Sequence, residues 1–220
     1  MEYTIKRSKR RTLAIKVCRN GSVEVLAPLR LNLAEIERFL VEKSGWIDTH
    51  RQAALQNEEL RRLFDLSFGD KVLVCGEEKT LTPGKSTALS GDILSVHEAT
   101  NDIKAETVKF YREHLRKTVM RFIAVYAPKM NVLPGAVRIT GAKGSWGSCS
   151  CRQTLSFSWR LCMADLRAIE YVVVHELAHI TEHNHQRQFW DIVGLYIDDI
   201  GHCKRQLKEL QQKLALQNWE

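Results

Sequence analysis

The chain has 220 residues, of which 44% are hydrophobic and 27% are charged. These values are ordinary for a globular protein, so they exclude a disordered chain, a collagen or a coiled coil as the main state. No apolar run approaches the roughly 20 residues that a membrane helix needs. The N-terminal MEYTIKRSKRR also lacks the apolar segment of a secretory signal. We therefore expect a cytoplasmic protein that does not associate with a membrane.

The net charge of +7 favours acidic partners such as nucleic acids, nucleotides or anionic surfaces. The first twenty residues hold seven Lys or Arg against one acidic residue, Glu2. One interpretation is a solvated basic strand at a sheet edge, since lysine and arginine discourage edge-to-edge pairing. The other is a surface on the N-terminal hairpin that binds nucleic acid or other anions weakly.

The chain has six cysteines, and we interpret all of them as inert free thiols in a reducing compartment. Cys149 and Cys151 are two residues apart, so on a strand both would face the same side and could suit a soft metal. Zinc sites made of thiolates usually need a second such pair, which the sequence lacks. The six residues are Cys18, Cys75, Cys149, Cys151, Cys162 and Cys203.

Residues 1–100 are predicted to form a β-rich subdomain with one long helix. Asn20-Gly21 is a strong hairpin signal, and Pro83-Gly84 indicates a turn. From Leu33 the apolar period becomes helical, which predicts a helix to about Leu60. Alternation of apolar and polar residues predicts strands at 3–8, 12–18, Ser22–Ala27, Lys71–Cys75 and Ile93–His97.

Residues 101–220 are predicted to be mainly helical, with a short sheet. A long amphipathic helix starts near Asp102 and ends near Pro128, and a final helix starts near Gln188. Another helix runs from Asp165 through YVVVHELAHITEH. Strands are expected at Ala136–Thr140 and Thr154–Trp159, with a glycine-rich loop at Gly141–Ser148. Strands followed by helices indicate an α+β fold.

His175-Glu176-Leu177-Ala178-His179 is an HExxH motif. Residues four apart share one face of a helix, so both imidazoles can reach one cation. Glu176 lies about 100° further round the helix, where it can hold a water molecule beside the metal. The plain alternative is an amphipathic helix with surface histidines and no metal.

His185 is the preferred third ligand. A straight helix would carry it to another face, so the helix must end and the chain must turn back. Asn184 tolerates the positive φ that such a turn can need. His183 competes, because it continues the face of His179. The His179-to-His185 spacing matches that of metzincins, except that Glu182 stands where those proteins carry a glycine.

Three neutral imidazoles leave one coordination position open, which is typical of a catalytic zinc site. The sequence therefore predicts a metal-dependent hydrolase with one Zn²⁺ per chain, or another divalent metal. Glu176 would take a proton from the metal-bound water as that water attacks a peptide carbonyl, and would then pass it to the leaving group.

Three sequence blocks resemble the YgjP-like metallopeptidase family: KGSWGSCS, LSFSWRL and VVVHELAHITEHNHQRQFW. The resemblance covers nearly the whole chain. It implies a zincin-like helical core of the gluzincin type behind an added N-terminal sheet, with zinc on His175, His179 and His185 and with Glu176 as base. The chain departs from the family at Gln153, where glycine is usual, and at Ser158, where asparagine is usual.

In the peptidase hypothesis, Thr154–Trp159 is an edge strand that pairs with an extended peptide, and the Ser145–Ser148 loop borders the cleft. The candidate substrate-binding residues are Trp146, Ser148, Trp159 and Arg160.

Two alternatives remain open. One is a hydrolase of nucleotide phosphoanhydrides (a pyrophosphatase), with phosphates held by Arg160, Lys143 and the amides of Gly144–Ser148. The other is a nucleic-acid-associated protease of the SprT-like kind, for which the basic N-terminal hairpin is the support.

Overall fold

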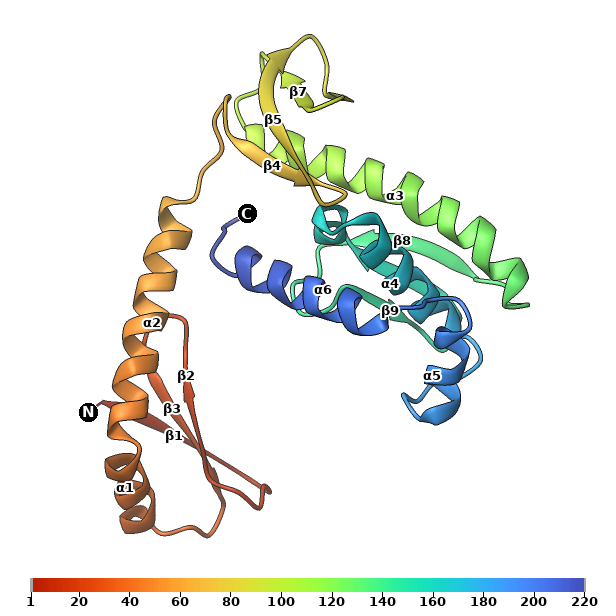
Figure 1. Cartoon of the computed structure of the whole chain (residues 1–220). Helices are drawn as coiled ribbons and strands as arrows, with labels where there is room; N and C mark the ends of the chain where they lie inside the picture. Colours follow the sequence, from red (N-terminus) through yellow and green to blue (C-terminus); the bar gives the residue numbers. More distant parts are fainter. Residues whose placement is uncertain (1, 220) are drawn as a thin grey trace. The chain divides into compact units, whose positions relative to one another are not determined.

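The computed structural model describes residues 2–219 and confirms a mixed α+β fold. Within these residues the chain forms three small sheets and divides into two compact units (Figure 1). The N-terminal unit comprises residues 2–64 with 214–218, and the C-terminal unit comprises residues 65–213 with 219. The subdomain boundary predicted near residue 100 falls inside the C-terminal unit, because the sheet of residues 71–97 packs against elements of that unit.

The N-terminal unit contains a three-stranded sheet. Its strands are β1 (Tyr3–Ser8), β2 (Ala14–Val17) and β3 (Val23–Pro28), in the order β1-β3-β2. β2 and β3 form the predicted hairpin, in which Gly21 has a φ of +75° and the Asn20 side chain accepts a hydrogen bond from the Ser22 amide. β1 lies parallel to β3.

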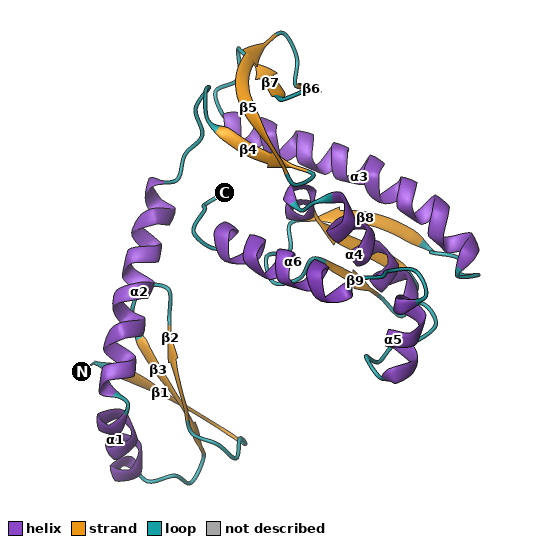
Figure 2. Ribbon diagram, viewed as in Figure 1, coloured by secondary structure: helices purple, strands orange, loops and turns teal. Residues whose placement is uncertain are grey.

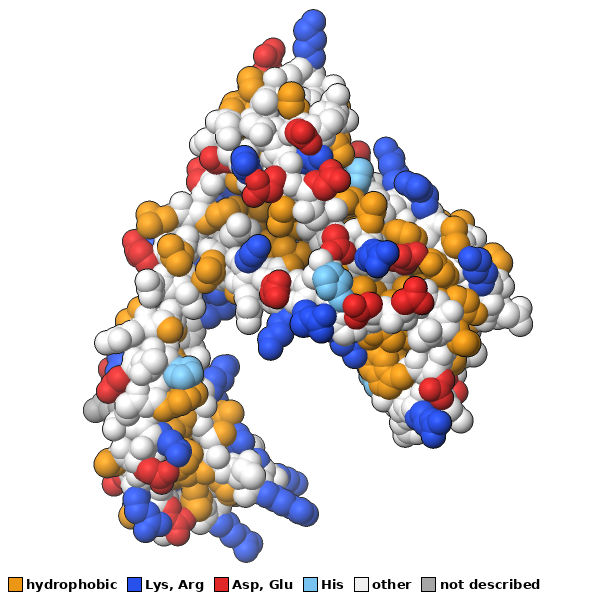
Figure 3. All heavy atoms as spheres, in the orientation of Figure 1, with side chains coloured by type: hydrophobic (Ala, Val, Ile, Leu, Met, Phe, Trp, Pro, Cys, Tyr) orange, Lys and Arg blue, Asp and Glu red, His pale blue; other side chains and the backbone are white. Residues whose placement is uncertain are grey.

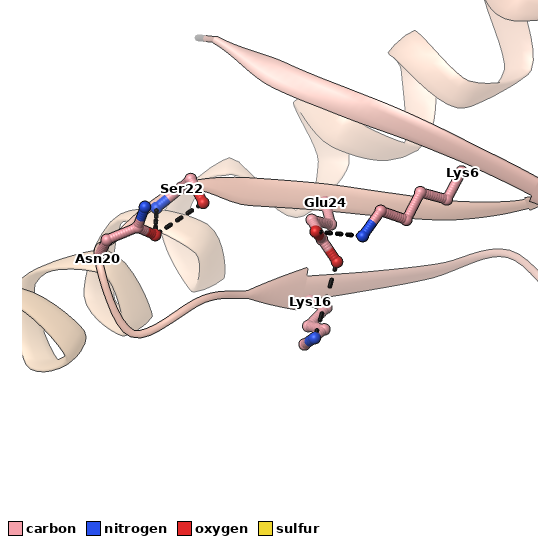
Figure 4. A network of polar contacts seen from close by, with 5 residues as sticks. All are labelled: Lys6, Lys16, Asn20, Ser22 and Glu24. Carbon is pink, nitrogen blue, oxygen red and sulfur yellow. Dashed lines mark hydrogen bonds and ion pairs between the residues drawn. The ribbon is translucent and has the colours of Figure 1, made fainter.

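Two helices follow the sheet, α1 (Leu33–Glu42) and α2 (Ser44–Leu63). The single long helix predicted here is wrong, because Lys43 leaves the helical conformation at φ −97° and ψ 10°. One face of β3 and the apolar side of these helices form the core of the unit: Val23, Val25, Ala27, Ile36, Leu40 and Ile47. Across the three strands, Lys6 and Lys16 both pair with Glu24 (Figure 4).

The C-terminal unit begins with a four-stranded sheet in the order β4-β5-β7-β6. The turn predicted at Pro83-Gly84 is wrong, since both residues end β5 and pair with Val96 and His97. β5 and β6 were not predicted, because β5 has a polar sequence whose buried positions include Lys79. The strands are β4 (Lys71–Val74), β5 (Glu77–Gly84), β6 (Ala88–Ser90) and β7 (Ile93–His97).

A long helix and a second sheet come next. Helix α3 (Ile103–Lys129) is capped by Asp102 and runs one residue past Pro128. The sheet contains β8 (Ala136–Thr140), β9 (Gly147–Cys149) and β10 (Thr154–Ser158) in the order β8-β10-β9. The predicted edge strand is therefore the central strand, and β9, expected as part of a loop, is at the edge.

The remaining helices complete the C-terminal unit (Figure 2). A 3₁₀ helix, η1 (Trp159–Met163), leads to α4 (Leu166–Ala178), which Asp165 caps. Helix α3 packs against α4, η1 and β8, and α4 also contacts β9 and α5. α5 spans Arg187–Gly194 and α6 spans Ile200–Leu214. Among the described helices, none combines the length and apolar character that a membrane crossing needs.

Candidate metal centre

Three histidine rings converge at the end of α4. The Nε2 atom of His185 lies 3.0 Å from that of His175 and 3.1 Å from that of His179. One ligand atom from each ring lies within 4.8 Å of the other two. Two nitrogen ligands on a tetrahedral zinc ion are about 3.3 Å apart, so this histidine cluster has nearly the spacing that one cation requires.

The chain turns back directly after α4, and this turn brings His185 to the cluster. His179 is the C-cap, and the amides of Ile180 and Thr181 donate to carbonyls three residues earlier, which tightens the turn. The predicted turn forms, but Asn184 does not use the positive φ that it tolerates. The hydrogen bonds between residues three apart reverse the chain without a left-handed residue. His183 is exposed and lies outside the cluster.

The protonation state of the rings suits metal binding. Burial lowers the pKa of His175 to about 3 and also lowers the pKa of His179, so both rings are neutral at neutral pH. The Nδ1 atom of His179 lies 2.9 Å from the Glu182 carbonyl oxygen. As the donor in that bond, Nδ1 carries the proton and leaves the Nε2 lone pair for a cation.

Glu176 is buried beside the cluster, and its Oε2 atom has no hydrogen-bond partner among the described residues. Burial raises the pKa of its carboxyl group to about 8. Burying an oxygen atom without a hydrogen-bond partner costs free energy unless a water molecule or an ion interacts with that atom. A divalent cation on the three imidazoles would favour the ionised carboxylate, so the residues present fit such an ion.

Strand β9 contacts the Glu176 side chain. A Cβ atom added at Gly147 would lie 2.6 Å from Oε1 and 2.8 Å from Cγ of Glu176. Only glycine therefore allows this strand to approach α4 so closely. Position 147 is part of the WGSC block, but glycine and serine are also typical of a loop, so the local pattern did not predict a strand there.

A pocket of about 310 Å³ adjoins His175 and Glu176. Trp146 and Tyr171 form part of its wall, and α6 contributes Lys204 and Lys208. The two lysines were not predicted, although their spacing of four residues places them on one face of a helix.

Aromatic residues of α5 support the histidine cluster. Phe189 is fully buried, and its ring centroid lies 4.8, 4.5 and 4.7 Å from those of His175, His179 and His185. Trp190 stacks on His185 at 5.7 Å, and the Lys204 ammonium lies 3.7 Å from the centroid of the Trp190 ring. Phe189 was not predicted as part of the site, because its place there depends on the turn after His179.

The candidate substrate-binding residues separate into two groups. Trp146 lines the pocket, and Ser148 is exposed on the edge strand β9. Trp159 is 3% exposed and stacks on Tyr111, so it belongs to the core and its prediction as a substrate contact is corrected. Arg160 lies over the Trp159 ring and donates a hydrogen bond to the Gly141 carbonyl, which ties it to the loop before β9.

The two positions that depart from the family pattern lie at the ends of β10. Gln153 has a φ of 58°, a conformation that glycine adopts with least strain. Ser158 is buried and donates to the Ala142 carbonyl at 2.6 Å, so it anchors the same loop. Neither residue belongs to the histidine cluster.

The family model described as "YgjP-like, metallopeptidase domain" matches residues 11–210. No curated protein matches the chain significantly. The matched region includes the histidine cluster, Glu176 and Gly147, and it spans most of the chain. The chain therefore belongs to the YgjP-like metallopeptidase domain family, which supports a metal-dependent peptidase activity in general.

Proposed function

We propose that the protein is a zinc peptidase in which His175, His179 and His185 hold the cation and Glu176 is the general base. The main support is the convergence of three Nε2 atoms beside a buried carboxylate with an unpartnered oxygen. When bound, zinc would supply a Lewis acid that activates water and polarises a carbonyl group.

The chain itself contributes proton transfer and substrate positioning. The Oε2 atom of Glu176 is available to accept a proton from the attacking water and to deliver it to the leaving nitrogen. Burial raises the pKa of Glu176, whereas a bound cation would lower it, so the carboxyl group can both take up and release a proton.

Substrate would bind along β9. Within residues 2–219, β9 pairs with β10 on one edge and has no partner strand on the other. An extended peptide can add to such an edge through main-chain hydrogen bonds. Because Gly147 contacts Glu176, a peptide on β9 would present its carbonyl groups near the general base.

The second candidate function is hydrolysis of a nucleotide phosphoanhydride. Lys204 and Lys208 border the pocket beside Glu176, which favours a substrate with an anionic group. In this hypothesis Lys204 and Lys208, which line the pocket, replace the predicted Arg160 and Lys143, which do not line it. The same two lysines would also suit an acidic or carboxy-terminal peptide.

Nucleic-acid association and a cytoplasmic location stay predictions. Figure 3 shows Lys and Arg side chains projecting from the lower part of the N-terminal unit. Lys6 and Lys16 there share a single carboxylate, Glu24, so the open sheet face keeps an excess of positive charge (Figure 4).

One experiment tests these functions together. Zinc-loaded protein is incubated with a peptide library and with nucleoside triphosphates, and Glu176→Gln protein serves as the matched control. We expect peptide cleavage that the variant lacks. Nucleotide hydrolysis without peptide cleavage would favour the second function, and equal activity of both proteins would exclude this site as the source.

A further inference from the structure

A second group of reactive side chains lies apart from the metal centre, at the turn between β4 and β5. Cys75 and Gly76 are the two central residues of this turn, with φ values of 51° and 85°. Positive φ at both positions is the requirement of a type I′ turn, which asparagine and glycine satisfy best. A cysteine there is strained, and such strain often marks a functional residue.

The turn is anchored to the segment that precedes α4. The Cys75 amide donates a hydrogen bond of 2.7 Å to the Cys162 carbonyl of η1. With standard bond lengths, this bond keeps the two Cα atoms within about 6.6 Å. A disulfide can join cysteines at such a separation without much backbone movement. Gly76 packs on Asp165, the N-cap of α4, so the turn lies at the start of the metal-binding helix.

The two thiols have different environments. Cys75 is half-buried, and its Sγ atom lies 3.6 Å from Nε2 of His114 on α3. Hydrogen bonds from Cys162 and His114 lower the pKa of the Cys75 thiol. Cys162 is fully buried, and its hydrogen bond to Cys75 together with burial raises its pKa. A thiolate with a protonated thiol beside it is the arrangement of an attacking and a resolving cysteine.

Other cysteines lack this environment. Burial raises the pKa of Cys149 and that of Cys203, which disfavours their thiolates. Cys151 is exposed and provides an internal reference for the reactivity of an ordinary surface thiol.

We propose that Cys75 and Cys162 form a peroxide-reactive dithiol site, with Cys75 as the attacking thiolate and Cys162 as the resolving thiol. The Cys75 sulfur attacks hydrogen peroxide and breaks the O–O bond, which leaves a sulfenic acid and hydroxide. The Cys162 sulfur then attacks Cys75, the S–O bond breaks, and water leaves. Overall, two thiols and one peroxide give one disulfide and two water molecules. The disulfide would tie the β4–β5 turn to η1.

The test uses the full reduced chain, treated with hydrogen peroxide and mapped by mass spectrometry of its peptides. We expect a Cys75–Cys162 disulfide to form before Cys151 is oxidised. In a Cys162→Ser variant, the Cys75 sulfenic acid should persist and be trapped by a 1,3-dione. A His114→Asn variant should slow the oxidation of Cys75.

A Cys75→Asn variant is the matched control, because asparagine suits the turn and leaves the fold intact. In this variant Cys162 should stay reduced. On the wild-type chain at about pH 6, alkylation of Cys75 should be at least about tenfold faster than that of Cys151. Oxidation or alkylation of Cys151 at an equal or higher rate would overturn the proposal, as would the absence of a trapped adduct in Cys162→Ser.

Discussion

Gly147 of β9 and Glu176 of α4 are packed so closely that any side chain at position 147 would displace the side chain of Glu176. A Cβ atom there would lie within 2.9 Å of three atoms of the Glu176 side chain. Because His175 is on the same helix and His179 is its C-cap, this contact couples the position of the edge strand to that of Glu176, the proposed general base. In the proposed mechanism, one glycine therefore aligns the edge that would bind substrate with the carboxylate that would accept the proton.

The first prediction follows from this contact. Gly147→Ala should displace the Glu176 carboxylate and lower kcat/KM by about 100-fold, the effect of a misplacement of about 1 Å. Metal content should stay near that of the wild type, because the three imidazoles are unchanged. Gly144→Ala is the matched control, since a Cβ there meets no atom of the described residues within 4 Å. Equal effects of the two substitutions would contradict the coupling.

Glu176→Gln should separate metal binding from catalysis. The amide is nearly isosteric with the carboxyl group but cannot accept the proton, so hydrolysis should fall by about 10²–10⁴-fold. Metal analysis of the purified variant should still give the wild-type stoichiometry. Loss of both activity and metal would instead make Glu176 a ligand.

The third ligand can be tested by two substitutions in one turn. His185→Ala should weaken zinc binding by more than about 100-fold, because it removes a direct ligand. His183→Ala should leave the affinity unchanged, since His183 is exposed and outside the cluster. Competition with a chromogenic chelator measures both. The reverse result would assign the ligand to His183.

Lys204 and Lys208 of α6 should determine the preference for substrates with an anionic group. Lys204→Gln with Lys208→Gln should raise KM for substrates with an anionic group by about tenfold, which corresponds to the loss of a charge-assisted hydrogen bond. KM for neutral peptides should change little. Lys213→Gln on the same helix is a control outside the pocket. Equal changes in KM for both substrate classes would show that the two lysines do not recognise the anionic group.

Trp159 should matter for stability rather than for substrate binding. Trp159→Ala removes a buried ring that stacks on Tyr111, so the free energy of unfolding should fall by about 3–5 kcal/mol. Denaturant unfolding measures this change. The conservative Trp159→Phe should keep KM unchanged, and a large rise in KM would restore the substrate-contact hypothesis.

The sequence predicted those parts of the site that depend on local spacing. HExxH determines which side chains share a helix face, and the six-residue interval to His185 requires a turn that could be inferred from geometry. The contacts of Gly147 and Phe189 could not be inferred in this way, because they depend on how β9 and α5 pack against α4.

The fold was hardest to predict where a charged residue occupies a buried position. Lys79 is 5% exposed, and its ammonium pairs with Glu77 at 2.6 Å and with Asp92 at 3.2 Å. A paired charge in a buried position hides the apolar alternation by which a strand is identified, so β5 was missed. Strand order was also hidden, because an edge strand and a central strand differ in long-range pairing and not in local pattern.

Trp219 has a consequence for biosynthesis. Its ring lies 5.8 Å from Tyr111 and 5.7 Å from Trp159, so a residue near position 220 completes the core around the N-terminal third of α3. This aromatic core cannot be finished until Trp219 has left the ribosome. The C-terminal unit therefore reaches its final packing only after the chain has been synthesised as far as Trp219, and a chain cut before this residue would lack part of the aromatic core.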